Sequence, residues 1–421
     1  MADVRAFRGI RYAYRALEDV TCPPYDIIGD EERAALATRD PFNVVRLELP
    51  RDGTDVYATA GEALRRWLRE GILAREGAPA FYLYEMRFTA NGREHSVLGC
   101  VGSVALEPFE RGVVLPHEET LSAAKADRFQ LMQATKCNIS QIYSLYFDDE
   151  RRTADFLREL ADREPDAAFT DGGVTHRLWV VTDEAACARI TRDFEDRKLY
   201  IADGHHRYET ALNYREWLRG RRENDPAAGS CMMMLVDIQN PGLVVFPFHR
   251  IVRGLQGFSL PLLLTSLRQD FAAEPARDAQ DAMRRLEAGR ADGHKVFALY
   301  TGGRFQMLTL RDITAMDEAL PDASPALKGL DVSVLHKLIL EKHLGIDAAA
   351  MAGGQNLRYT RLAEEALSAV DSGEAELAFF LNPTRVAEIA AVAGAGEKMP
   401  QKSSYFYPKL TTGLVMHPLW M

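Results

Sequence analysis

The sequence predicts a mixed α/β (α+β) protein, and three observations support that fold class. Its 421 residues are 47% apolar and 27% charged, which are ordinary proportions for globular domains. Residues 81–88 and 97–106 are expected strands joined by Asn91-Gly92, the strongest short-range signal for a β-hairpin. Residues 199–202 form an expected strand that breaks at Asp203-Gly204 and passes into a helix reaching about Arg219.

Length and charge limit the organisation and the possible partners. At about 100 to 200 residues per domain, two domains are the first expectation, and we place them at residues 1–250 and 251–421. The formal charge is 51 minus 61, or −10, so no general basic field attracts a nucleic-acid backbone. Bulk DNA binding is therefore disfavoured.

Cysteine usage and hydropathy predict a protein of the reducing cytoplasm with no membrane contact. The N-terminal residues are rich in arginine, and apolar runs elsewhere fall short of about 18 residues. The cysteines are odd in number and at least 37 residues apart, so neither a disulfide framework nor a CxxC metal site is indicated. Buried, inert thiols are expected at all of them: Cys22, Cys100, Cys137, Cys187 and Cys231.

The remaining elements follow from periodicity. Residues 57–70 are an expected helix, since Ala60, Leu64 and Trp67 recur at helical spacing. Residues 164–173 are rich in turn formers, and 232–237 with 243–248 bracket Asn240-Pro241-Gly242 as a second expected hairpin. Further expected elements are a strand at 177–182 and helices at 151–162, 184–195, 279–288 and 332–343.

The sharpest local signal is the segment Asp203-Gly204-His205-His206-Arg207, which we call the box. A glycine turn between a strand and a helix leaves the first helical N–H groups free to bind an anion, and phosphate is the natural guest. Cations at a helix N-terminus oppose the helix dipole, so their presence points to a negative ligand. The alternative is structural: both histidines are hydrogen-bonded, and Arg207 pairs with Asp203 or Glu209.

A second polar cluster runs from Pro116 to Arg128. Its carboxylates could hold magnesium or act as a general base, and its cations could neutralise phosphoryl charge. The alternative is a solvated loop that caps a helix at Thr120. The spacing does not match HExxH, so zinc hydrolysis is not supported. The candidate residues are His117, Glu118, Glu119, Lys125, Asp127 and Arg128.

Three shorter features complete the set of candidates. Pro23-Pro24-Tyr25-Asp26 could project Tyr25 and Asp26 into a cleft, or form a simple strand-entry turn. His249-Arg250 ends a strand, either as substrate contacts or as an edge-exposed pair. The segment 399–409 carries Lys402 and Ser403 in a turn, either over a phosphate or as a hydrophobic C-terminal clasp.

These motifs, taken in this order along nearly the whole chain, resemble the domain of unknown function 1015 family. The box further resembles the phosphate-binding box of the ParB and sulfiredoxin-like superfamily, which includes free serine kinase. That resemblance implies nucleotide phosphate held by Gly204, His205, His206 and Arg207, within a ParB/sulfiredoxin-like unit that carries inserted antiparallel strands and precedes a C-terminal α+β domain. Sulfiredoxin has a reactive cysteine where this chain has His205, and ParB has a basic DNA-binding segment that this acidic chain lacks.

The leading hypothesis is a phosphotransferase that uses Mg²⁺ and a nucleotide, ADP or ATP, to move phosphate to or from a small hydroxy amino acid. Phosphoryl transfer needs positioning and charge neutralisation more than covalent groups. Serine or phosphoserine is the substrate that the resemblance implies. The alternative is a nucleotide-binding regulatory protein without turnover, and a nuclease or DNA-binding protein is less favoured because of the charge.

Overall fold

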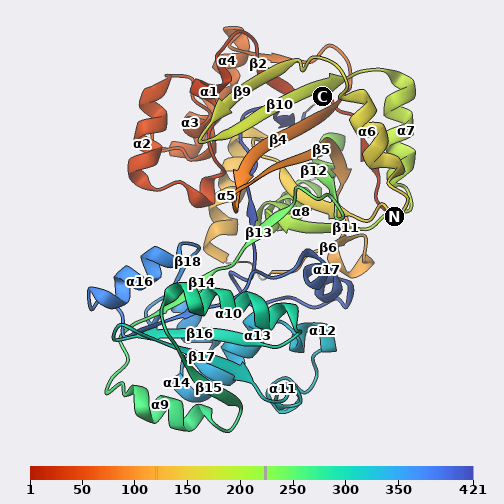
Figure 1. Cartoon of the computed structure of the whole chain (residues 1–421). Helices are drawn as coiled ribbons and strands as arrows, with labels where there is room; N and C mark the ends of the chain where they lie inside the picture. The colour runs from red at the N-terminus through yellow and green to blue at the C-terminus, as the bar shows by residue number, and fades with distance from the viewer. Residues whose placement is uncertain (119, 121, 222–224, 421) are drawn as a thin grey trace. The chain divides into compact units, whose positions relative to one another are not determined.

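The computed structural model describes residues 1–118, 120, 122–221 and 225–420 (Figure 1). It has a mixed α/β fold, as the sequence predicts. The chain divides into two compact units. Unit 1 comprises Met1–Pro116, Thr120–Val244 and Phe406–Met421, and unit 2 comprises His117–Glu119 and Val245–Tyr405. The boundary expected at residue 250 falls inside unit 2, in strand β14 (His249–Val252).

A mixed sheet forms the centre of unit 1. Its strand order is β6 (Val114–Leu115), β11 (Leu199–Asp203), β8 (Ile142–Tyr146), β12 (Ser230–Asp237), β5 (Arg93–Ala105), β4 (Phe81–Ala90), β10 (Val174–Val181) and β9 (Ala167–Asp171). β11 is parallel to β6, β12 is parallel to β8, and the other neighbours are antiparallel. β1 (Val4–Arg5) also pairs with β5.

The first expected hairpin is present, but the prediction of the second is wrong. Asn91 and Gly92 have φ of 51° and 70°, the positive values of a tight hairpin turn, and Ala90 pairs with Arg93 across it. β12 lies between β5 and β8, so both of its edges are occupied and β13 (Val244–Phe246) cannot pair beside it. Residues 164–173, expected as turns, contain β9, which completes the sheet beside β10.

Helices pack on the sheet of unit 1 where apolar periodicity predicts them. Ala60, Leu64 and Trp67 are the buried stripe of α4 (Val56–Arg69), which packs against α5 (Ser122–Thr135), and α5 in turn packs against α8 (His205–Gly220). In Figure 1, α6 (Arg152–Leu160) and α7 (Glu184–Phe194) lie together at one side of the sheet, and α2 (Asp30–Arg39) and α3 (Val45–Glu48) lie at the other. Two small sheets join β2 (Ile10–Tyr12) to β3 (Leu73–Arg75), and β7 (Cys137–Asn138) to β21 (His417–Pro418).

Unit 2 is built on an antiparallel sheet. Its order is β15 (Phe271–Ala276), β17 (Arg304–Leu310), β16 (Val296–Thr301), β19 (Leu377–Phe380), β14 and β18 (Leu357–Thr360). Its core joins apolar residues of these strands to α10 (Ala279–Ala291) and α16 (Ala363–Asp371).

The helix expected at 332–343 in unit 2 is present with an irregular centre. It is divided into α13 (Asp331–Val334), a π-helical segment η4 (Leu335–Glu341) and α14 (Lys342–Leu344). Within the described residues of both units, no helix combines the length and the apolar character that crossing a membrane requires.

Candidate functional site

The box lies at the turn between β11 and α8, as the sequence predicts. Gly204 precedes the helix with φ 97° and ψ 27°, in the left-handed region, and no side chain caps the helix there. A Cβ atom at this position would lie 2.9 Å from Nη2 of Arg207. Glycine is therefore required both by the backbone conformation and by the close approach of Arg207.

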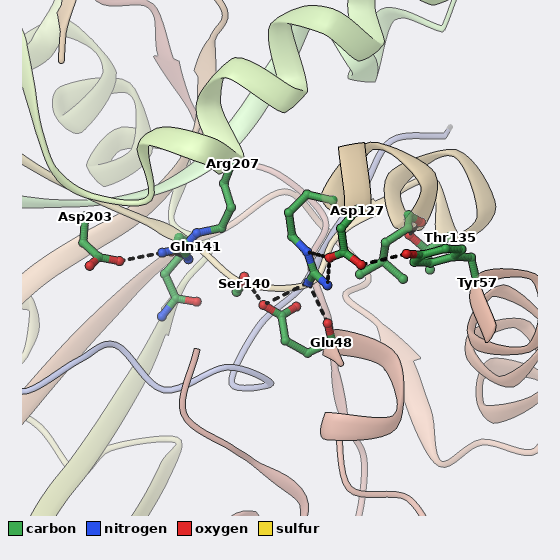
Figure 2. Close-up of polar contacts among 10 residues, drawn as sticks. Glu48, Tyr57, Asp127, Thr135, Ser140, Gln141, Asp203 and Arg207 are labelled. Carbon is green, nitrogen blue, oxygen red and sulfur yellow. Dashed lines mark hydrogen bonds and ion pairs between the residues drawn. The ribbon is translucent and has the colours of Figure 1, made fainter. Parts of the chain in front are cut away.

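Arg207 is held from two sides beneath this turn (Figure 2). Its Nη2 donates to Oδ2 of Asp203 at 2.6 Å, and its Nη1 donates to the backbone oxygen of Gln141 at 2.5 Å. Lys409 pairs with the other oxygen of Asp203. Burial alone would raise the pKa of Asp203, but Lys409 and Arg207 hold that pKa well below its ordinary value. The pair between Arg207 and Asp203 matches the structural alternative for this arginine.

Arg128 forms a second buried cationic centre in unit 1, against Asp127 and Glu48, which are labelled in Figure 2. Its side chain is 5% exposed and donates to the backbone oxygen of Glu48 at 2.6 Å and to Oδ2 of Asp127 at 2.5 Å. Tyr57 donates to the other oxygen of Asp127 at 2.7 Å. The Glu48 carboxylate lies 3.9 Å from Arg128 and accepts a hydrogen bond from Ser140 at 2.8 Å. Both oxygens of Asp127 are thus engaged.

The two guanidinium groups line one internal cavity. Its volume is about 40 Å³, which exceeds the roughly 10 to 15 Å³ that one water molecule requires. Two buried polar atoms of its lining residues, Thr210 Oγ1 and Arg207 Nε, have no hydrogen-bond partner within the described chain. An unsatisfied buried polar atom costs about 1 to 3 kcal/mol. Other polar lining residues are Glu48, Asn138 and Ser140.

Tyr25 and Asp26 belong to the same cluster. The Arg128 guanidinium lies 4.0 Å from the centroid of the Tyr25 ring, a cation–π contact. Burial, with the charge of Asp26, raises the pKa of Tyr25 to about 12, so this phenol stays protonated at neutral pH. Burial by itself would lower the pKa of Arg207, but Asp203 and Asp26 raise it.

The start of α5 contacts the first turns of α8. Lys125 Nζ and Thr120 Oγ1 each donate to the same carboxylate oxygen of Glu209 at 2.7 Å. His205, in the first turn of α8, is buried, and His206 beside it is partly exposed. The expected neighbours of the box therefore include Thr120, Lys125 and, through the shared cavity, Arg128.

The remaining candidates lie together in unit 2. Lys402 donates its backbone N–H to Oε1 of Glu118 at 2.9 Å, and Arg250 donates to the backbone oxygen of Lys402 at 3.2 Å. His117 lies 3.2 Å from the hydroxyl of Ser404, measured from its Nε2. His249 and Ser403 are buried in the same unit. Glu119, expected as a base or metal ligand, lies outside the described residues.

A metal site built from protein side chains is not found. No three histidine, cysteine, aspartate or glutamate residues of the described chain lie close enough together to hold an ion.

Comparison with known families places the chain. The model of a family described as "Protein of unknown function (DUF1015)" matches residues 4–333. The chain belongs to the DUF1015 family. A search of curated proteins finds no match.

Three solved structures illustrate how distant the structural likeness is. A conserved hypothetical protein from Pyrococcus furiosus is 13% identical, with 75% of this chain and 95% of that chain covered and a TM-score of 0.35. Free serine kinase in complex with AMP is 13% identical, with 75% and 92% covered and a TM-score of 0.36. SbnI from Staphylococcus aureus, with a C-terminal truncation, is 12% identical, with 76% and 87% covered and a TM-score of 0.38.

Several residues of the site in unit 1 are not among the residues predicted from sequence, Glu48, Gln141, Thr210 and Lys409 among them. Glu48 and Gln141 belong to no local motif, and Gln141 contributes its backbone oxygen, which no side-chain pattern reveals. Thr210 follows the box by one helical turn, so helical spacing from Arg207 could have found it. Lys409 is the last residue of the segment 399–409, but its partner Asp203 lies 206 positions away in the sequence.

Proposed function

We propose that this protein binds the phosphates of a nucleotide at the turn between β11 and α8, and transfers a phosphoryl group to or from a small hydroxy amino acid. One observation carries the proposal. The buried guanidinium groups of Arg128 and Arg207 line the same cavity at the start of α8, where Thr210 Oγ1 and Arg207 Nε have no partner among the described residues. A phosphate oxygen is the acceptor that both atoms need.

The charges around the turn support phosphate rather than a neutral ligand. Gly204 has no side chain to cap the helix, so a ligand can meet the first N–H groups of α8. Lys125 and Arg128 reach this region from α5, each already paired with a carboxylate. Phosphoryl transfer is catalysed mainly by positioning and by neutralising the charge on the transferred group, and fixed cations supply both.

We assign the roles within unit 1 as follows. Gly204, His205, His206 and Arg207 hold phosphate, and Lys125 and Arg128 neutralise the developing charge. Glu48 is the carboxylate that lines the cavity, so we assign it acceptance of the proton from the substrate hydroxyl. Asp127 is less suited to that task because Tyr57 and Arg128 occupy its two oxygens.

ADP or ATP is the proposed phosphate donor, and serine the proposed acceptor. Mg²⁺ commonly binds through the phosphates with only one or two protein carboxylates. The described residues offer no cluster of metal ligands. We therefore assign the ion no protein ligands and no part in the transfer reaction. Glu118, expected from the sequence as a metal ligand, accepts instead from the Lys402 N–H in unit 2 and has no role in this site.

Phosphorus NMR of the purified full-length protein tests the proposal directly. One reaction contains Mg²⁺, ADP or ATP, and serine, and the reverse contains AMP or ADP with phosphoserine. We expect phosphoserine to form in one direction or to be consumed in the other. Nucleotide binding without turnover in any mixture would favour the regulatory alternative, and a failure to bind any nucleotide would refute the proposal.

A pair of arginine variants on one helix links the activity to the box. Arg207→Gln removes the buried cation beside Gly204, whereas Arg219→Gln changes a 64% exposed arginine near the end of α8. The free energy of nucleotide binding should become less favourable by about 1.5 to 3 kcal/mol for the first variant and remain unchanged for the second. Equal affinities, measured by calorimetry on folded samples, would leave Arg207 with the structural role alone.

A further inference from the structure

Arg250 in unit 2 is a buried cation that pairs with no carboxylate among the described residues. Its side chain is completely buried, with Nη1 donating to the backbone oxygen of Phe248 and Nη2 to that of Lys402. Its Nε has no hydrogen-bond partner, and no carboxylate of the described chain forms an ion pair with it. A buried charge is normally paired, because leaving it without a counter-charge is costly.

Among the described residues, an imidazole and an aromatic ring, rather than carboxylates, lie beside this guanidinium, whose carbon is 5.2 Å from the centroid of the Tyr359 ring. His336 lies on the π-helical segment η4 and accepts from Nη2 of Arg250 through its Nε2 at 3.1 Å. Single π-helical turns often occur at functional sites, and here the irregular turn carries the histidine that faces Arg250. His249, the preceding residue on β14, is buried, and its Nδ1 has no partner within the described chain. His336 therefore orients the guanidinium. Consecutive residues of a strand point to opposite faces of the sheet, so His249 projects away from Arg250, and its ring centroid lies 4.9 Å from that of Phe380.

The turn that contacts Arg250 is strained. Lys402 has φ 56°, in the left-handed region that residues with a side chain rarely adopt. Hydrogen bonds hold the backbone of Lys402 on both sides, because Glu118 accepts from its N–H and Arg250 donates to its carbonyl oxygen. The exposed Lys402 ammonium lies 5.6 Å from the Phe248 ring centroid, and Phe248 is joined to Arg250 by a hydrogen bond. The residue whose carbonyl contacts Arg250 is thus itself a cation with an exposed side chain.

A neutral carbonyl is a weaker partner for a guanidinium than a charged oxygen. Hydrogen bonds between arginine and carboxylate or phosphate are roughly twice as strong as neutral ones and are often bidentate. The Lys402 carbonyl thus occupies a position where an oxyanion would bind more strongly, and its release would relieve the strain at Lys402.

We propose that Arg250, with His336 and the Lys402 ammonium, forms a binding site in unit 2 for a small oxyanion, a carboxylate or a phosphate. The oxyanion takes the place of the Lys402 carbonyl on Arg250. Arg250 and Lys402 contact the anion, and His336 is a positioning residue. The site lies wholly within unit 2 and does not depend on the nucleotide site proposed for unit 1.

Histidine-ring NMR of the full-length protein tests the site. Inorganic phosphate, serine and phosphoserine are titrated separately at constant ionic strength, and the ring signals are assigned through single glutamine substitutions of each histidine. We expect saturable shifts at His336 with at least one anion, up to concentrations on the order of 10 mM. A response to serine identifies carboxylate as the ligand group, and a response to inorganic phosphate identifies phosphate.

A conservative pair of variants controls the experiment. Arg250→Lys keeps the charge but loses the planar fork, and should weaken binding at least tenfold. Arg253→Lys is the matched control, because Arg253 follows on the same chain segment and bonds only the backbone oxygens of Gln355 and Gly354. Should Arg250→Lys fail to fold, Lys402→Ala changes an exposed side chain and should also weaken binding. Equal affinity in the tested variant and the control would overturn the site.

The wild-type titration decides the question without any variant. Unchanged signals of His336 with all three anions would overturn the proposal. His205 and His206 report separately on the box in unit 1. Signals that move in one unit and not in the other therefore separate this inference from the proposed nucleotide site.

Discussion

The ion pairs of Asp203 give a prediction whose size can be worked out from the structure. Asp203 is 14% exposed and contacts two cations, Arg207 and Lys409, that are each 11% exposed. Removing one partner of a buried ion pair costs about 3 to 5 kcal/mol because a charge is left uncompensated. Asp203 would retain Arg207 in Lys409→Met, so we expect the lower value, about 3 kcal/mol of unfolding free energy.

Thermal and chemical denaturation measure this loss. For domains of 150 to 250 residues, 1 kcal/mol corresponds to roughly 2 to 4 °C, so the Tm should fall by roughly 6 to 12 °C. Lys328→Met is the matched control, because its partner Asp317 is 62% exposed and such pairs contribute about 0.2 to 1 kcal/mol. If the cost comes from an uncompensated carboxylate, Asp203→Asn combined with Lys409→Met should recover part of it.

Acid titration adds an independent check on the same group. The folded pKa of Asp203 is depressed, so its contribution is complete above the unfolded pKa of about 3.9 and is lost as the pH falls below it. Lys409→Met raises that folded pKa, and the variant should therefore lose less stability than the wild type between about pH 4 and pH 2. The reasoning is refuted if Lys409→Met costs no more than Lys328→Met, or if both proteins have the same acid profile.

Three further predictions concern the same turn and cavity. Gly204→Ala should destabilise the protein by about 1 to 3 kcal/mol in urea unfolding, because a side chain is strained at φ 97° and contacts Arg207, whereas Gly220→Ala, with open space around it, should cost nothing. Thr210→Val should leave the free energy of unfolding unchanged or slightly raised, because it removes a buried hydroxyl that has no partner among the described residues. Calorimetry should nevertheless show roughly tenfold weaker phosphate binding, and unchanged binding would remove Thr210 from the site. Glu48→Gln can still accept from Ser140, so it should fold and bind nucleotide but turn over about 100-fold more slowly, and full activity would move the proton acceptor elsewhere.

Local structure in this chain is largely predictable because its signals are short-range. Asn91-Gly92 identifies its hairpin since two adjacent residues supply both positive φ angles, and Gly204 identifies the break between β11 and α8. The hairpin expected after β12 fails for a long-range reason. Asn240-Pro241-Gly242 does not reveal that β5 and β8 already occupy both edges of that strand.

The site is predictable only where its residues belong to one motif. The box is readable because strand, glycine and helix are consecutive. The pairing of Lys409 with Asp203, and the placement of Glu48 beside Arg128, depend on tertiary contacts between segments that share no spacing. A single sequence also cannot separate the candidates of the two units, because His117 and Glu118 lie in unit 2 while Lys125 and Arg128, a few residues later, lie in unit 1.

The division of the chain into units has a consequence for synthesis on the ribosome. Unit 2 has all of its residues once Tyr405 has been made, but unit 1 also needs residues 406–421, which carry Lys409 and β21. Domains commonly fold as units while the chain is still growing. Here the earlier part of unit 1 must wait, with Asp203 lacking one of its two cations, until the final segment has emerged. Holdase chaperones that shield nascent chains should therefore engage unit 1 for longer than unit 2.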